Sequence, residues 1–180
     1  WHEIRKRFLT LYQQAATTRN EATTRLHLID RLLFECLGWE KADCASEERF
    51  EGKFTDYALA APHRLLIVEA KREGIYFELP AGETKIRAIK IRHFEKYNAD
   101  VFLAVQQCLN YCQERGTPFG AVCNGHQLII FIGSRLDGIP PVDGYALAFT
   151  SLQEIHKYFT LVWNCVSKPG VQSKGMLREL

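Results

Sequence analysis

The chain has 180 residues, of which 47% are hydrophobic and 24% are charged, and its formal net charge is +2. This size and composition predict one soluble globular domain with a substantial core. We expect no membrane association, because no apolar run approaches the ~20 residues of a spanning helix. The small net charge neither requires nor excludes a nucleic-acid partner.

The N-terminal sequence and the cysteines indicate a cytoplasmic location. The first residues, WHEIRKRF, lack the apolar segment of a signal peptide, and a Trp in place of Met is compatible with a fragment of a longer chain. None of the six cysteines forms a CxxC pair. Cys108 and Cys112 can share a helix face, but without further ligands they make a weak zinc site. We therefore expect a cytoplasmic protein with buried free thiols.

Two helices are expected at the start of the chain. Residues 3–16 and 20–37 carry apolar side chains at helical spacing. Asn20 is a suitable N-cap for the second helix, and Gly38 ends it.

A β-hairpin follows a polar loop that is expected over residues 39–53. Residues 55–60 and 65–70 read as strands, and the connection Ala61-Pro62-His63-Arg64 predicts a tight antiparallel turn. Two Gly and one Pro predict a loop over residues 74–84.

The second half contains a helix and another hairpin. Residues 100–113 are expected to be helical, whereas residues 85–97 fit either a helix or an extension of the preceding loop. Strands are expected at 119–123 and 127–133, because Asn124-Gly125 is a strong hairpin turn.

A short strand and a helix end the predicted order. The strand is expected at 145–149 and the helix at 152–166, and the sequence KPGVQSKGMLREL at the end is compatible with a linker. The order predicts an α/β fold with a central mixed sheet of four to five strands flanked by helices. We treat residues 1–180 as one domain, with its core at about 15–135 and a C-terminal helix and possible linker over 151–180.

The first hairpin carries an unusual set of charges. The buried-looking run Leu65–Val68 ends in Glu69-Ala70-Lys71. Residues two apart on a strand project from the same face, so Glu69 and Lys71 point together. Counting from the turn places Asp56 roughly opposite Glu69. Two carboxylates and one ammonium are therefore expected at one end of the sheet.

These groups suit metal-assisted hydrolysis of a phosphodiester. Mg²⁺ takes oxygen ligands and often binds through one or two carboxylates together with a substrate phosphate. Asp56, Glu69 and the carbonyl of Ala70 are candidate ligands, with Mn²⁺ as a substitute. Lys71 can orient or deprotonate a water, or stabilise charge on the phosphate. The alternative is a solvated Glu–Lys ion pair worth under ~1 kcal/mol.

The spacing Asp56-x12-Glu69-Ala70-Lys71 resembles the PD-(D/E)xK signature of the restriction-endonuclease-like superfamily, with Thr55 in the place of the Pro. The resemblance covers about residues 15–135. It implies a restriction-endonuclease-like core and a Mg²⁺-dependent nuclease.

Three further segments strengthen this resemblance. Residues 20–39, which end in Leu-Gly-Trp, resemble the helix that opens the nuclease domain of type I restriction motor subunits, and the hairpin at 119–133 is similar to the one that closes it. The resemblance implies that Glu21 faces the catalytic site, as a metal or water ligand, although a first-turn acid favoured by the helix dipole is an alternative.

Gln107 and Tyr111 resemble the QxxxY motif of type I-like members. Their spacing of four residues places both side chains on one helix face, where they can bind a phosphate or a metal-bound water. An ordinary half-buried aromatic is an equally good interpretation of Tyr111.

A basic run follows the first hairpin. Lys85, Arg87, Lys90 and Arg92 are candidates for contacts with nucleic-acid phosphates, which would give salt-dependent, sequence-independent affinity. A solvated helix face is the alternative.

The sequence therefore leads to a first hypothesis and two alternatives. The first is a Mg²⁺-dependent DNA endonuclease domain, the effector of a prokaryotic restriction or antiphage defence system, acting as a homo-oligomer or fused to a sensor or ATPase module. The second is a catalytically silent module of the same fold that binds nucleic acid or supports an assembly. The third is a phosphohydrolase that acts on nucleotides.

Overall fold

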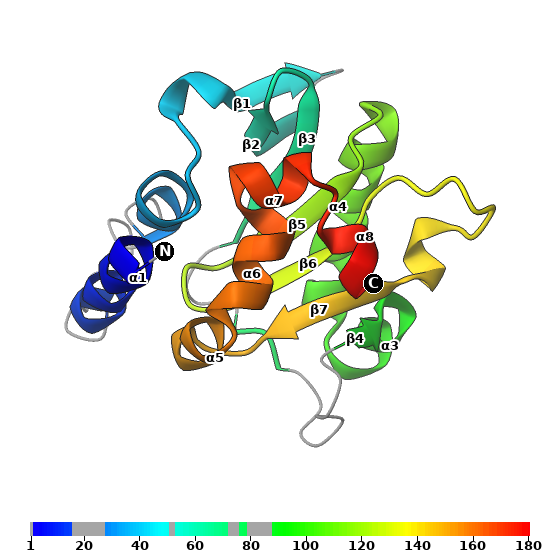
Figure 1. The fold of residues 1–180 in the computed structure, drawn as a ribbon. Coiled ribbons are helices and arrows are strands. Elements are labelled where there is room, and N and C mark those ends of the chain that lie inside the picture. Colours follow the sequence, from blue (N-terminus) through cyan, green and yellow to red (C-terminus); the bar gives the residue numbers. More distant parts are fainter. Residues whose placement is uncertain (1, 16–27, 51–52, 72–75, 79–87) are drawn as a thin grey trace.

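One mixed sheet of seven strands forms the centre of the molecule (Figure 1). The computed structural model describes residues 2–15, 28–50, 53–71, 76–78 and 88–180. In sheet order the strands are β1 (Cys44–Phe50), β2 (Lys53–Ala60), β3 (Arg64–Ala70), β5 (Phe119–Cys123), β6 (Leu128–Ile132), β7 (Tyr145–Phe149) and β4 (Ala88–Lys90).

Helices cover both faces of this sheet (Figure 1). They are α1 (His2–Ala15), the π-helical turn η1 (Arg31–Cys36), the 3₁₀ turns η2 (Lys41–Asp43) and η3 (Pro141–Asp143), α3 (Ile91–Tyr97), α4 (Ala99–Glu114), α5 (Leu152–Lys157), α6 (Phe159–Val166), α7 (Lys168–Gln172) and α8 (Met176–Glu179). Within the described part of the chain, no helix is both long and apolar enough to cross a membrane.

The central strands β3 and β5 run parallel, whereas every other neighbouring pair in the described sheet is antiparallel. A parallel pair needs a crossover connection, and α4 lies on that connection. The carboxyl ends of β3 and β5 consequently lie side by side, with Glu69 opposite Val122 and Ala70 opposite Cys123.

Two hydrophobic layers separate the sheet from its helices. Leu66, Val68 and Ala70 belong to the layer beneath α1, η1 and α6, whereas Ile67 belongs to the layer beneath α4. Because side chains alternate along a strand, Glu69 projects on the same face as Ile67, toward α4. The continuous apolar run of β3 is thus explained by burial on both faces.

The structure confirms an α/β fold but corrects the expected sheet of four to five strands to seven. The expected polar loop at 39–53 contains η2 and most of β1. Among the described strands, β1 pairs with β2 alone, and an edge strand tolerates charged residues such as those of CASEERF. The basic segment 85–97, which fitted either a helix or a loop, contains β4 and then α3. Strand β4 pairs with β7 at the other edge of the sheet.

The ends of the chain differ from expectation as well. The predicted helix at 20–37 lies partly outside the described residues, and its described part includes the π-helical turn η1. The helix expected at 152–166 is two helices, α5 and α6, that meet at Tyr158. The segment compatible with a linker instead forms α7 and α8, which bury Val171 and Met176 in the core.

The six cysteines are free thiols, as expected, and five of them are buried while Cys44 is half-buried. Burial raises the pKa of Cys36 and of Cys165 to about 12 and that of Cys123 to about 11. These thiols stay protonated at neutral pH and act as small apolar side chains.

We predict that Gly175→Ala destabilises the protein more than Gly116→Ala. Gly175 has an ordinary helical backbone, but an added Cβ would overlap the carbonyl oxygen of Asn164 in α6. Such overpacking costs about 3 kcal/mol. At Gly116 the Cβ meets nothing within 4 Å, and only its φ of +60° opposes alanine, at about 1 kcal/mol. Urea unfolding measures both losses, and equal losses would contradict the close approach of α6 and Gly175.

Candidate active site

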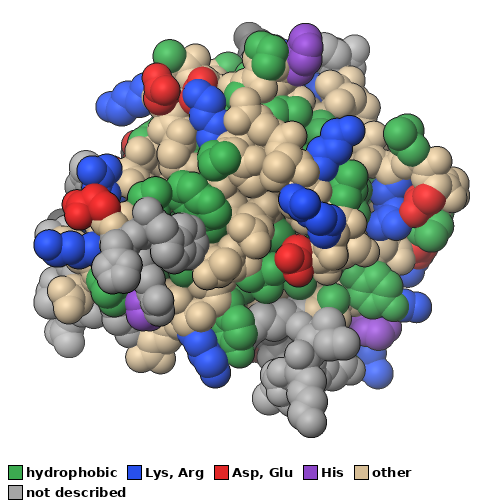
Figure 2. Space-filling model, in the orientation of Figure 1, with side chains coloured by type: hydrophobic (Ala, Val, Ile, Leu, Met, Phe, Trp, Pro, Cys, Tyr) green, Lys and Arg blue, Asp and Glu red, His purple; other side chains and the backbone are tan. Residues whose placement is uncertain are grey.

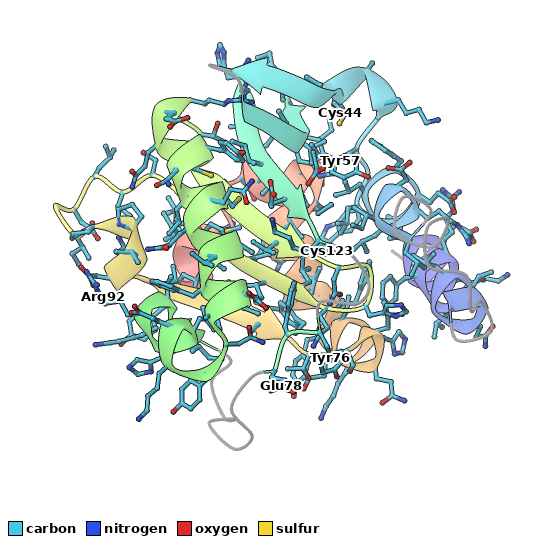
Figure 3. The ribbon with its side chains drawn as sticks, turned by 180° about the vertical axis from the view of Figure 1, so that it is seen from behind. Cys44, Tyr57, Tyr76, Glu78, Arg92 and Cys123 are labelled. Carbon is cyan, nitrogen blue, oxygen red and sulfur yellow. The ribbon has the colours of Figure 1, made fainter. Side chains whose placement is uncertain are left out.

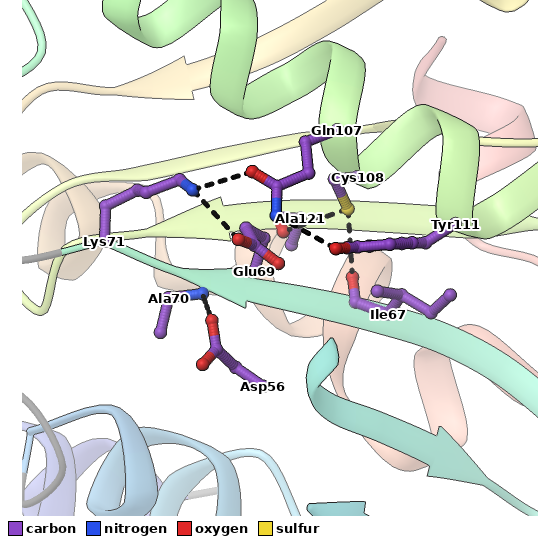
Figure 4. Close-up of polar contacts among 9 residues, drawn as sticks. All are labelled: Asp56, Ile67, Glu69, Ala70, Lys71, Gln107, Cys108, Tyr111 and Ala121. Atoms are coloured by element: carbon purple, nitrogen blue, oxygen red, sulfur yellow. Dashed lines mark hydrogen bonds and ion pairs between the residues drawn. The ribbon is translucent and has the colours of Figure 1, made fainter. Parts of the chain in front are cut away.

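A polar cluster lies at the carboxyl end of β3, beneath α4 (Figure 4). Glu69 is the penultimate residue of β3 and only 4% exposed. Lys71 follows the strand directly, and its backbone N–H donates to the carbonyl of Cys123 at 2.8 Å. The neighbouring parallel strand β5 thereby fixes the backbone of Lys71 at the carboxyl end of β3.

A chain of contacts joins β3 to α4. The ammonium Nζ of Lys71 lies 2.9 Å from Glu69 Oε1 and donates to Gln107 Oε1 at 3.2 Å. The amide Nε2 of Gln107 in turn donates to the hydroxyl of Tyr111 at 3.0 Å. Gln107 and Tyr111 therefore share one face of α4, as their spacing predicts, and Tyr111 is buried.

Asp56 reaches the same end of the sheet from β2. The ladder between β2 and β3 pairs Tyr57 with Val68 as its last residues on this side. Beyond this pair, Asp56 Oδ2 accepts a hydrogen bond from the backbone N–H of Ala70 at 2.7 Å. The side chain of Asp56 thus replaces a backbone acceptor where the two strands separate (Figure 4).

Glu69 is buried, and the Cys108 thiol of α4 packs against its strand. The Cys108 thiol of α4 donates to the carbonyls of Ile67 at 3.8 Å and Ala121 at 3.5 Å, which lie on β3 and β5. Burial, the neighbouring Cys112 thiol and the Glu69 carboxylate raise the pKa of Cys108 well above its usual value. Cys108 therefore stays neutral and fills space rather than acting as a nucleophile.

The oxygen atoms of this cluster suit a hard cation. Among the described residues, no group of three or more His, Cys, Asp and Glu side chains surrounds a possible metal position. Mg²⁺ needs fewer protein ligands, since it keeps several waters and often binds through one or two carboxylates. Asp56 and Glu69 supply two. The Ala70 carbonyl lies on the same side of β3 as its N–H, which faces Asp56.

Gln127 is a buried residue near the cluster that the sequence analysis missed. Its amide receives the N–H of Phe77 at 2.7 Å and donates to the Phe77 carbonyl at 3.0 Å. It also donates to the Thr150 carbonyl at 3.1 Å and accepts from Asn124 Nδ2 at 2.8 Å. Gln127 thereby fastens the chain that follows Lys71 to the ends of β5 and β7. Its one sequence signal is a glutamine beside the apolar run of β6.

Two of the basic residues predicted to contact nucleic acid, Lys90 and Arg92, lie far from the cluster. Lys90 ends β4, which lies four strands away from β3, or about 19 Å. It pairs with Tyr145 at the start of β7, so it lies at the opposite end of the sheet from Ala70. Arg92 is bound to Asp143, which raises the pKa of Arg92, and Figure 3 shows it far from Cys123.

Three of the predicted site residues, Glu21, Lys85 and Arg87, lie outside the described residues. Comparisons with protein-family models, with curated proteins and with solved structures found no match. The functional interpretation therefore depends on the chemistry of Asp56, Glu69, Lys71 and the two residues of α4.

We predict that Asp56→Ala lowers the free energy of unfolding by about 1–2 kcal/mol, because the Ala70 N–H loses its acceptor. Asp56→Asn keeps an oxygen at this position and is expected to cost under about 0.5 kcal/mol. Chemical denaturation of both variants measures the difference. If both substitutions cost the same, Asp56 does not cap β3.

Proposed function

We propose that this protein is a metal-dependent nuclease that hydrolyses phosphodiester bonds in DNA. The observation that carries the proposal is the position of the Lys71 ammonium between Glu69 and Gln107, at the end of a strand whose Ala70 N–H donates to Asp56. The Glu69–Lys71 pair lies where two parallel strands end, which is where α/β sheets commonly bind ligands.

The residues divide the chemistry among them. Asp56, Glu69 and the Ala70 carbonyl would hold Mg²⁺ or Mn²⁺, which when bound supplies a Lewis acid for the phosphate and an activated water. Lys71 places a positive charge where negative charge develops on the phosphate oxygens. Gln107 orients the lysine, and Tyr111 orients Gln107. The side chain of Lys71 is 20% exposed, so a substrate can reach it from solvent.

The proposed membership of the restriction-endonuclease-like superfamily has two supports. At the end of β3, the PD-(D/E)xK-like residue Asp56 accepts from the Ala70 N–H, and Glu69 pairs with Lys71. The QxxxY-like pair Gln107 and Tyr111 reaches the same lysine from α4. On this basis we propose a restriction or antiphage role, in which cleavage of both DNA strands requires two copies of the site through homo-oligomerisation or a fused partner module.

One contact favours the second candidate, a silent module of the same fold. Glu69 is engaged by the Lys71 ammonium at 2.9 Å, and this ion pair competes with a cation for the carboxylate. If the Glu69–Lys71 ion pair persists in the presence of metal ions, the protein would bind nucleic acid without cutting it. Metal binding and cleavage therefore have to be measured separately.

We predict that the protein nicks or linearises supercoiled plasmid in Mg²⁺ or Mn²⁺ and that Lys71→Ala lowers the rate at least about 100-fold, through loss of a preorganised positive charge. Lys157→Ala in α5 is the matched control, since this lysine lies outside the cluster. Cleavage by Lys71→Ala at the wild-type rate would refute the assignment. If the wild type is inactive, a fused coiled coil supplies the dimer, and inactivity of that dimer favours the silent module.

We also predict that Mn²⁺ raises the melting temperature of the wild type but not that of Asp56→Asn. A ligand that binds only the folded state stabilises it by RT ln(1 + [L]/Kd), which is about 2.7 kcal/mol at 100 times Kd. Thermal unfolding with and without 5–10 mM metal, roughly a saturating range for a weak site, measures the shift. Equal shifts in both proteins would place the metal elsewhere.

A further inference from the structure

A second site candidate lies at the other end of β3 and β5. A cavity of about 750 Å³ opens there between the sheet, the helices α7 and α8 and the loop that follows β6. Leu65, Phe119 and Ile132 line it from the sheet, and Leu177 lines it from α8. This volume and apolar lining are typical of sites for small molecules. Leu65 and Glu69 are about 13 Å apart along β3, so the cavity is separate from the polar cluster.

Lys174 has an unusual backbone at the edge of this cavity. Its φ of +55° is the left-handed conformation, in which glycine is strongly favoured. The Lys174 N–H donates to the Val171 carbonyl at 3.0 Å, and the Gly175 N–H donates to the Gly170 carbonyl at 2.9 Å. These two bonds form a Schellman motif at the end of α7. The chain thus has lysine at a position where glycine would be the favoured residue. A backbone outlier of this kind is often found where the side chain has a function.

The charges that line the cavity leave one cation unmatched. Arg135 Nε donates to Asp137 Oδ1 at 3.1 Å, and this hydrogen bond lowers the pKa of Asp137 to about 2. Arg135 and Asp137 therefore neutralise one another near neutral pH. The Lys174 ammonium forms no ion pair with any residue that the structure describes. Figure 2 shows basic side chains beside hydrophobic ones on this face, over α7 and α8.

We propose that this cavity binds a small amphipathic anion, such as a medium-chain carboxylate. Its apolar body would contact Leu65, Phe119 and Leu177, and its carboxylate would pair with Lys174. A nucleic-acid strand does not fit this chemistry, because it needs a series of cations along its phosphates rather than one. The inference does not rest on the proposed nuclease activity.

Titration of the protein with 8-anilinonaphthalene-1-sulfonate tests this proposal, because the probe combines an apolar body with one anionic group. The expected result is saturable fluorescence with one probe per chain, displaced by decanoate and at least fivefold less well by decanol. Lys71→Ala should bind the probe as the wild type does, since its site lies at the other end of β3.

Two variants assign the site. Lys174→Gly relieves the left-handed backbone, so its melting temperature should equal or exceed that of the wild type, while its affinity for decanoate falls roughly five- to tenfold. Leu177→Glu places a carboxylate on the half-exposed wall of the cavity and should weaken decanoate binding by a similar factor. Lys157→Ala, in a helix that does not line the cavity, is the matched control. Unchanged affinity in both cavity variants, or equal displacement by decanol, would overturn the proposal.

Discussion

The parallel pairing of β3 with β5 is the contact on which the candidate active site depends. It aligns Ala70 with Cys123 and leaves the Lys71 N–H bonded to the Cys123 carbonyl at 2.8 Å. The same topology requires a crossover, and the α4 helix on it passes directly over the carboxyl end of β3. Without this pairing, Glu69 and Lys71 would end an ordinary hairpin in solvent, and Gln107 would have no lysine to contact.

The burial of Glu69 explains why an apolar strand ends in an acid and a base. A buried carboxylate is costly unless it is paired and hydrogen-bonded. Lys71 supplies the charge, Gln107 holds the lysine, and Tyr111 holds Gln107. Removal of Lys71 would leave the buried Glu69 charge without this ion pair, which is costly in the interior of a protein.

The two ends of β3 and β5 differ in chemistry because different elements cover them. At the carboxyl end, α4 contributes polar side chains, and Gln127 fastens the chain beyond Lys71. At the amino end, α7 and α8 contribute mainly apolar side chains together with Lys174. One pair of strands thereby carries a polar site for a proposed metal and an apolar site for a proposed small anion, with the buried core between them.

Local sequence determined the hairpin, the helix over residues 100–113, the second hairpin and the pairing of Glu69 with Lys71, because each depends on periodicity or on turn residues over short distances. It did not determine β1 and β4 at the sheet edges, the burial of α7 and α8, or the role of Gln127. These features depend on contacts between residues far apart in the chain, and an edge strand or a short helix carries too few apolar residues to reveal its partner. Tertiary structure alone decided that Arg92 faces Asp143 rather than the site.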